Sequence, residues 1–112
     1  MTDGTAIQDQ QAAAQDERLH PRYEGHLEAF LMFRGAPWRC WIRDLSLGGA
    51  GLEPALPAAL GHAVELTSPS FDFEGALPGR VVNVAERRTC VAFDLDLERL
   101  DTLARFLSAQ IG

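Results

Sequence analysis

Short apolar segments separated by turn residues run from about residue 26 to residue 94 of the chain. In the segment 38–44, two arginines alternate with apolar side chains, which is typical of a strand with one buried face. We assign Trp38, Cys40 and Ile42 to the buried face. The same pattern predicts strands over residues 26–33, 38–44, 50–54, 62–68, 71–86 and 89–94. We expect the strand over 71–86 to be interrupted near Pro78 and Gly79.

The spacing of the apolar positions changes after residue 94. Leucine, alanine and isoleucine then recur every three or four residues, which is the spacing of one helix face. This face carries Leu97, Leu100, Leu103, Ala104, Leu107 and Ile111. We predict a helix over residues 96–110, with Asp94 or Asp96 as its N-cap. The apolar face could bind a partner, but packing on the protein's own core is the preferred interpretation.

Residues 1–17 differ from the rest of the chain in having few large apolar side chains. Gln, Ala and Asp predominate there, so we predict a disordered acidic tail. Residues 18–112 are predicted to form one domain, because a chain of this length supports a single modest core. Short strands with regularly spaced turns favour an all-β fold, either a small antiparallel barrel or a sandwich. We expect the C-terminal helix to cover an open edge or end of that fold.

The composition, 46% hydrophobic and 23% charged over 112 residues, is that of a globular chain. No apolar run is long enough for membrane insertion. The N-terminus lacks the basic start and the apolar segment of a signal peptide, so we expect a cytoplasmic protein. Cys40 and Cys90 lie in apolar surroundings, and we interpret them as buried thiols rather than as a disulfide.

The formal net charge is −6, and residues 1–17 contribute four acidic side chains without a base. The remaining chain has 12 acidic and 10 basic residues, and all ten bases are arginine. An acidic chain is a poor partner for nucleic acid polymers, whose nonspecific binding depends on the neutralisation of many phosphates. A small anionic ligand remains compatible, because arginine's planar guanidinium fits phosphates and guanine edges. The lack of lysine has an alternative explanation, codon bias in a GC-rich genome.

The sequence RDLSLGGAGLEP, residues 43–54, follows an apolar segment and has more polar and glycine positions than a plain hairpin needs. Asp44 and Ser46 point the same way in an extended chain. Asp44 can accept two hydrogen bonds from a flat donor edge such as that of guanine, and Ser46 can both donate and accept. Gly48 and Gly49 permit positive φ and a close approach of ligand to backbone. The alternative is an Asx-type turn capped by a hydroxyl, which needs no ligand.

A second unusual stretch, ERLHPRYEG, lies where the tail meets the domain at residues 17–25. Arg18 and Arg22 are four residues apart, and Pro21 disfavours helix at the residue before it. A stiffened arm with two arginines can bind a phosphodiester or the Hoogsteen edge of a purine, because both accept bidentate guanidinium bonds. Taken alone, this spacing is weak evidence for a site.

Together, the two stretches resemble the PilZ domain family. RLHPR (18–22) and DLSLGG (44–49) match its RxxxR and DxSxxG motifs position for position. The matching residues are Arg18, Arg22, Asp44, Ser46 and Gly49. The resemblance covers residues 17–110 and includes GRVVNV (79–84), VAFDLD (91–96) and the leucine-rich helix.

The resemblance implies a six-stranded barrel that binds the bacterial second messenger cyclic di-GMP, with neither enzymatic activity nor a cofactor. The expected ligand-binding residues are Arg18, Arg22, Asp44, Ser46, Gly48 and Gly49. We further expect ligand binding to order a flexible arm, residues 18–25, and to change a surface that a protein effector recognises. The alternative is a PilZ-like adaptor that binds a protein partner constitutively, without nucleotide.

Other chemistry is weakly represented in the sequence. The three histidines and two cysteines lack metal-ligand spacing, so we predict no metal site. No catalytic triad, carboxylate pair or Walker-type phosphate loop is present. Trp41 either stacks on a guanine, docks a partner or packs partly against the protein itself. Arg87 and Arg88 are interpreted as a solvated turn.

Overall fold

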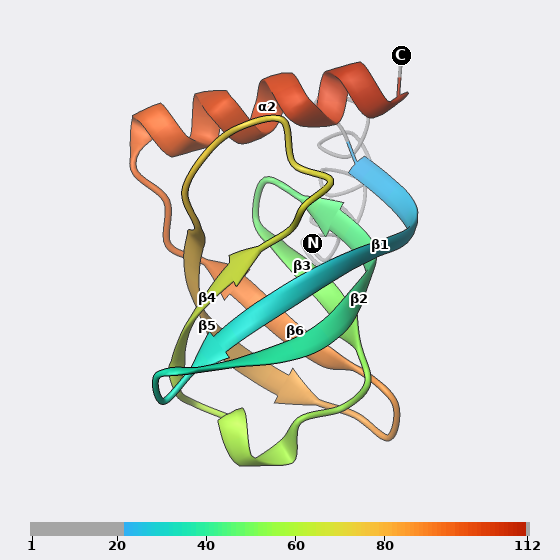
Figure 1. Cartoon of the computed structure of the whole chain (residues 1–112), viewed down its shortest axis with the longest axis vertical. Coiled ribbons are helices and arrows are strands. Elements are labelled where there is room, and N and C mark those ends of the chain that lie inside the picture. The colour runs from blue at the N-terminus through green and yellow to red at the C-terminus, as the bar shows by residue number, and fades with distance from the viewer. Residues whose placement is uncertain (1–21, 112) are drawn as a thin grey trace, which may run out of the picture.

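The computed structural model describes residues 22–111, so the predicted tail and Arg18 lie outside the described residues. Six antiparallel strands close into a barrel in the order β1-β2-β3-β6-β5-β4 (Figure 1). The strands are β1 (Arg22–Phe33), β2 (Ala36–Ser46), β3 (Gly49–Glu53), β4 (Ala63–Thr67), β5 (Leu77–Val84) and β6 (Thr89–Phe93). A short 3-10 helix, η1 (Pro57–Ala59), follows β3, and the helix α2 (Leu97–Ile111) follows β6. The prediction of a six-stranded barrel with a C-terminal helix is confirmed.

Strands β1 and β2 form a long hairpin whose two-residue turn is Arg34-Gly35. Both turn residues have positive φ, 55° and 77°, which is the backbone twist that suits a tight connection between antiparallel strands. β1 begins at Arg22, four residues before the predicted start, so residues 22–25 of the predicted arm belong to the sheet. Apolar patterning did not reveal this extension, because its backbone pairing with the end of β2 defines it.

The barrel interior is filled by aliphatic side chains, among which Leu31, Ile42 and Leu66 are almost completely buried. Both cysteines are free thiols, as predicted, and burial raises the pKa of Cys40 to about 11. Cys90 is only half-buried, so its assignment as a buried thiol was wrong. Trp38, in contrast, is 47% exposed, so its assignment to the core was wrong. Trp38 lies near the start of β2, where the barrel ends, and its ring only borders a cavity of about 150 Å³.

The segment between β4 and β5 is a loop where the sequence predicted the first part of a strand. β5 begins at Leu77, and Pro78 and Gly79 pair with β4 inside the strand rather than interrupting it. Proline is tolerated there because it lies near the strand's start. Its carbonyl oxygen still accepts a hydrogen bond from the Asp94 backbone N–H at 2.8 Å. The prediction of a broken strand over 71–86 was therefore wrong.

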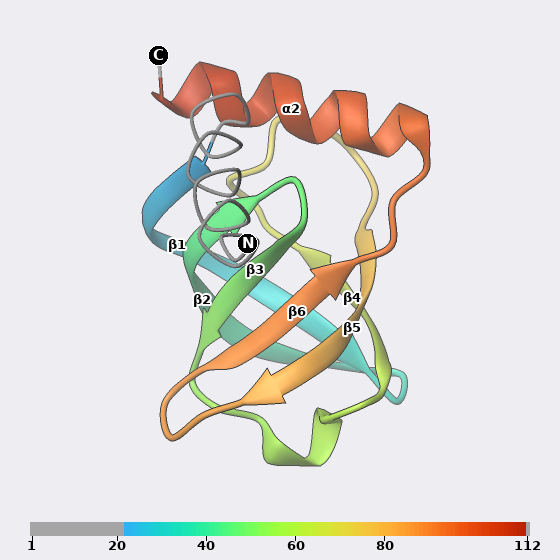
Figure 2. The same cartoon turned by 180° about the vertical axis from the view of Figure 1, so that it is seen from behind.

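Helix α2 lies across one end of the barrel, as both views show (Figures 1 and 2). The Asp96 carboxylate accepts a hydrogen bond from the Arg99 backbone N–H at 2.8 Å, which identifies Asp96 as the cap. Leu103 and Leu107 are fully buried, as predicted. Leu97, the first residue of the helix, is 85% exposed, so its assignment to the apolar face packed on the core was wrong.

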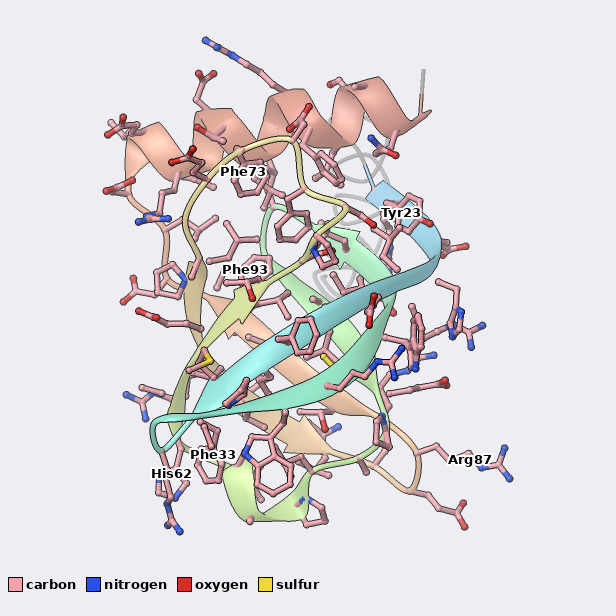
Figure 3. The ribbon with its side chains drawn as sticks, in the orientation of Figure 1. Tyr23, Phe33, His62, Phe73, Arg87 and Phe93 are labelled. Carbon is pink, nitrogen blue, oxygen red and sulfur yellow. The ribbon has the colours of Figure 1, made fainter. Side chains whose placement is uncertain are left out.

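Phe106 is the largest buried side chain of α2, and the apolar pattern did not single it out. It packs edge-on against Phe71 and Phe73 of the β4–β5 loop, with ring centroids 5.2 and 5.9 Å away. Figure 3 shows Phe73 beneath the helix. The loop therefore serves as the layer that joins the helix to the barrel.

Candidate functional site

The two polar motifs meet at the open end of the β1–β2 hairpin. Across this ladder Arg22 lies opposite Ser46, and Glu24 lies opposite Asp44. Directly opposed residues have Cβ atoms about 4.5–5.5 Å apart. The structure thus brings Arg22, Asp44 and Ser46 into one surface, although 22 residues separate Arg22 from Asp44 in the sequence. Arg18 falls outside the described residues.

An irregularity in β2 decides which side chains face outward. The β2–β3 register shifts between Ile42 and Asp44. Ile42 and Leu45 are both fully buried, so the two residues between them, Arg43 and Asp44, lie outside the barrel. Such a bulge is a common way to re-aim a side chain at a functional surface. Ser46 follows the buried Leu45, in agreement with the predicted shared face of Asp44 and Ser46.

Asp44 forms an ion pair that the sequence interpretation did not anticipate. Arg88 Nη1 donates to Asp44 Oδ2 at 3.1 Å. The Arg88 side chain is 41% exposed and the Asp44 side chain 24% exposed, so Arg88 lies in a partly solvated turn between β5 and β6, as predicted, and in addition pairs with Asp44. Arg87, its neighbour, is exposed and points away from the barrel (Figure 3). Arg88 therefore joins the candidate site, and Arg87 does not.

Gly51 makes room for this ion pair. It lies on β3 between Asp44 of β2 and Cys90 of β6. A Cβ at Gly51 would lie 2.5 Å from Asp44 Oδ2 and 3.1 Å from Arg88 Cδ. Arg88 precedes β6 by one residue, and its side chain crosses the outer surface of β3 at Gly51 to meet Asp44. It can therefore reach over β3 only because residue 51 has no side chain.

Gly48 and Gly49, in contrast, do not use the backbone freedom that we expected of them. The described glycines with positive φ are Gly35, Gly61 and Gly75. Gly49 is needed for close packing, because a Cβ there would collide with the carbonyl oxygen of Val91 on β6. Gly48 is exposed, and a Cβ there would meet nothing within 4 Å. The surface beside Gly48 is thus open to a ligand, whereas Gly49 is a structural requirement.

Ser46 has one hydrogen bond within the protein. Its hydroxyl donates to the carbonyl oxygen of Gly49 at 3.4 Å, a distance at the weak end of the hydrogen-bond range. A hydroxyl that caps the turn in this way is part of the alternative interpretation, an Asx-type turn that needs no ligand. A contact of that length holds the hydroxyl loosely, so its exchange for a ligand oxygen would cost little.

Trp41 has protein partners on its ring. The ring stacks on His26 with centroids 4.6 Å apart and an angle of 13°, and the guanidinium carbon of Arg39 lies 5.1 Å from the ring centroid. Trp41 is only half-buried. These contacts favour the partial-packing interpretation, and a guanine that stacked on the face covered by His26 would have to displace the imidazole.

A large cavity lies away from this surface. It has a volume of about 720 Å³, and its lining from β4, β5 and β6 includes Val64, Arg80 and Phe93 but none of the motif residues. Within residues 22–111 no group of three or more His, Cys, Asp and Glu side chains could hold a metal ion. None of the helices in that same range has the length and apolar character needed to cross a membrane.

A comparison with models of known protein families shows which family this chain belongs to. The model of the PilZ domain matches residues 16–109. This chain belongs to the PilZ family. The PilZ match includes both polar motifs and extends into α2. No curated protein sequence matched the chain at a significant level.

Solved structures share the PilZ fold. The PilZ domain of CeSA from a cellulose-synthesizing bacterium is 19% identical, with a TM-score of 0.69, and the match covers 81% of this chain and 98% of that one. The Bacillus subtilis inhibitor of motility MotI/DgrA is 14% identical, with a TM-score of 0.61 and coverage of 81% and 49%. The Borreliella burgdorferi PlzA protein, solved in complex with cyclic di-GMP, is 25% identical, with a TM-score of 0.56 and coverage of 91% and 45%. The PilZ domain described here spans about half the length of the last two proteins.

Sequence reasoning missed Arg88 and Gly51 as members of this surface. A signal for Gly51 was present, because a glycine within a predicted strand often marks a close approach of other groups. Nothing in the sequence distinguished Arg88 from Arg87, since both belong to the same turn. Only the register of β6 against β3 places one of them beside Asp44.

Proposed function

We propose that this PilZ domain is a receptor for cyclic di-GMP and that Arg22, Asp44 and Ser46 are the described residues that bind it. The observation that carries the proposal is the strand register that places Arg22 opposite Ser46, with Asp44 on the same outer surface. The PlzA relative, solved with cyclic di-GMP, supports the ligand's identity. Arg18, outside the described residues, is the remaining member expected from the family motif.

The chemistry of these side chains fits the ligand. The Asp44 carboxylate can accept hydrogen bonds from N1–H and N2–H₂ of a guanine, and the Ser46 hydroxyl can donate to a phosphate or ribose oxygen. Arg22 is exposed at the start of β1 and can bind a phosphate or the guanine Hoogsteen edge with its planar fork. Micromolar affinity needs about 8 kcal/mol. Hydrogen bonds to charged groups contribute about 1.5–3 kcal/mol each, so a handful suffices after the ordering entropy is subtracted.

The signal would pass through the segment before β1. Since Arg22 already belongs to the β1–β2 ladder, the proposed ordering concerns the residues that carry Arg18. Bound ligand would hold that segment against the β2 surface and create a face for a protein effector. Hydrogen exchange of the full chain tests this step, and we expect slower exchange in residues 18–21 with ligand than without it.

Calorimetric titration of the full chain with cyclic di-GMP tests the binding step. Arg22→Ala and Asp44→Ala should each weaken binding on the order of tenfold or more, because each removes a charged hydrogen-bonding group. Arg105→Ala is the matched control, since Arg105 is an exposed arginine on α2 that pairs with Asp101 of the same helix. The affinity of Arg105→Ala for cyclic di-GMP should equal that of the wild type.

Two results would contradict the proposal. Absence of binding by the wild-type protein would favour the adaptor alternative, in which a protein partner is recognised without nucleotide. Equal weakening by Arg105→Ala would show that net charge rather than a defined site governs the interaction. Thermal unfolding of each variant without ligand establishes that the barrel is intact.

A further inference from the structure

Two neighbouring strands and the turn before a third form one arrangement on the outer surface of the barrel. Asp44 of β2 projects outward at the bulge, Gly51 of β3 leaves the space beside it empty, and Arg88, in the turn just before β6, extends over that space. The single contact between the two charged groups joins Arg88 Nη1 to Asp44 Oδ2. The other carboxylate oxygen and four of the five guanidinium N–H donors take no part in it.

The stability of the fold gives a weak reason for this ion pair. Both side chains are partly exposed, and pairs of that kind contribute little to the free energy of unfolding. Glu24 lies opposite Asp44 on the other side, so Asp44 stands between a like charge on β1 and a cation from the turn before β6. The arrangement therefore places a carboxylate next to a cation on a partly exposed surface, which is more useful for recognition than for packing.

An outward carboxylate beside an outward guanidinium presents hydrogen-bond acceptors and donors side by side. One edge of guanine presents the opposite order, with the donors N2–H₂ and N1–H followed by the acceptor O6. The carboxylate can take the two donors while the guanidinium donates to O6. Adenine presents an acceptor at N1 and a donor at its exocyclic nitrogen, so the same pair of side chains meets adenine with mismatched groups.

We propose that Arg88 is a specificity-determining residue that, together with Asp44, reads the hydrogen-bonding edge of a guanine. This inference rests on the proposed function. It adds a residue from outside the two sequence motifs and gives a reason for the glycine at position 51. O6 has two lone pairs, so an arginine at the Hoogsteen side and Arg88 at the N1 side can bind the same base.

The test compares cyclic di-GMP with cyclic di-AMP by calorimetry and competition, using the full chain. Arg88→Ala should bind cyclic di-GMP about tenfold more weakly than the wild type, which is the scale of one good base contact. The ratio of the affinities of Arg88→Ala for cyclic di-GMP and for cyclic di-AMP should fall by a similar factor. Arg87→Ala removes the same charge from the adjacent, outward-pointing residue and should change neither quantity.

Two further variants separate base reading from charge and from folding. Arg88→Lys keeps the charge but loses the planar fork that can bond Asp44 and O6 together, so it should recover only part of the lost affinity. Gly51→Ala keeps both charged groups but places a Cβ between them, and it should also weaken binding several-fold. Melting temperatures without ligand should stay close to the wild-type value for the Arg88 variants.

The possible outcomes distinguish this inference from the proposed function. If the wild-type protein binds no cyclic di-GMP, both are overturned. If it binds and Arg88→Ala binds equally well with the same preference, only the role of Arg88 is overturned. Tighter binding by Arg88→Ala would also overturn it and would identify the ion pair as a latch that competes with the ligand. If Arg88→Lys recovered the full affinity for cyclic di-GMP, or if Arg87→Ala lost as much affinity as Arg88→Ala, charge alone would explain the effect. Either result would overturn the role of Arg88 in reading the base.

Discussion

The β1–β2 turn and the β2–β3 turn both contain glycine, and they need it for different reasons. Gly35 in the first turn has a φ of 77°, and a Cβ there would meet nothing within 4 Å. Gly49, the first residue of β3 after the second turn, is not among the positive-φ residues, yet a Cβ there would collide with the Val91 carbonyl. The first glycine is required by a backbone dihedral angle, and the second by the distance between β3 and β6. The comparison shows that a glycine in a motif is not by itself evidence of a ligand.

The largest effect is expected from Gly49→Ala. The clashing neighbour is a backbone carbonyl in a paired strand, so the clash can be relieved only if β3 and β6 separate. We expect the free energy of unfolding to fall by about 2 kcal/mol, in line with overpacked cores. For a domain of this size that corresponds to a melting temperature roughly 10 °C lower. Thermal unfolding of the ligand-free variant measures its melting temperature, and an unchanged value would contradict the packing explanation.

A smaller effect is expected from Gly35→Ala. Space is available for the methyl group, but alanine is strained at positive φ, and the cost should be about 1 kcal/mol. Gly35→Asn is the matched control, because asparagine tolerates this backbone region better than alanine does. Chemical denaturation should therefore rank the wild type first, the asparagine variant second and the alanine variant last. The reverse order of the two variants would argue against a dihedral cause.

The smallest effect on stability is expected from Gly48→Ala. This position has neither positive φ nor a nearby atom, so the free energy of unfolding should change by no more than about 0.5 kcal/mol. If a ligand approaches the backbone here, as the motif predicts, the added methyl group should still weaken cyclic di-GMP binding several-fold. Loss of stability without loss of affinity would assign Gly48 to the fold rather than to the site.

The sequence predicted the regular parts of the molecule better than its boundaries. Alternation of apolar residues located all six strands, and the helical spacing located α2 and its Asp96 cap. The start of β1 was missed because its exposed polar residues are held by pairing with β2 rather than by burial. Trp38 was misplaced for a related reason: alternation indicates the side of a strand, but not how far the barrel extends along it.

The candidate site was predicted in the same uneven way. The motifs at 18–22 and 44–49 indicated Arg22, Asp44 and Ser46, and the β1–β2 ladder places these three together. The expected backbone freedom of Gly48 and Gly49 was not found, because φ at a glycine depends on the turn that the neighbouring strands impose. Arg88 could not be predicted, since its contact with Asp44 joins residues 44 positions apart.

By itself, the sequence determined the strand and helix periodicity, the family and the residues of the two motifs, because each depends on the order of side chains along a short stretch. Tertiary structure alone decided that Arg88 rather than Arg87 accompanies Asp44, that Gly49 spaces β3 from β6, and that Phe106 anchors α2. These features depend on register and on the distance between strands. Both are properties of the closed barrel as a whole, since a shift of one residue in any ladder would turn every side chain of that strand to the opposite face.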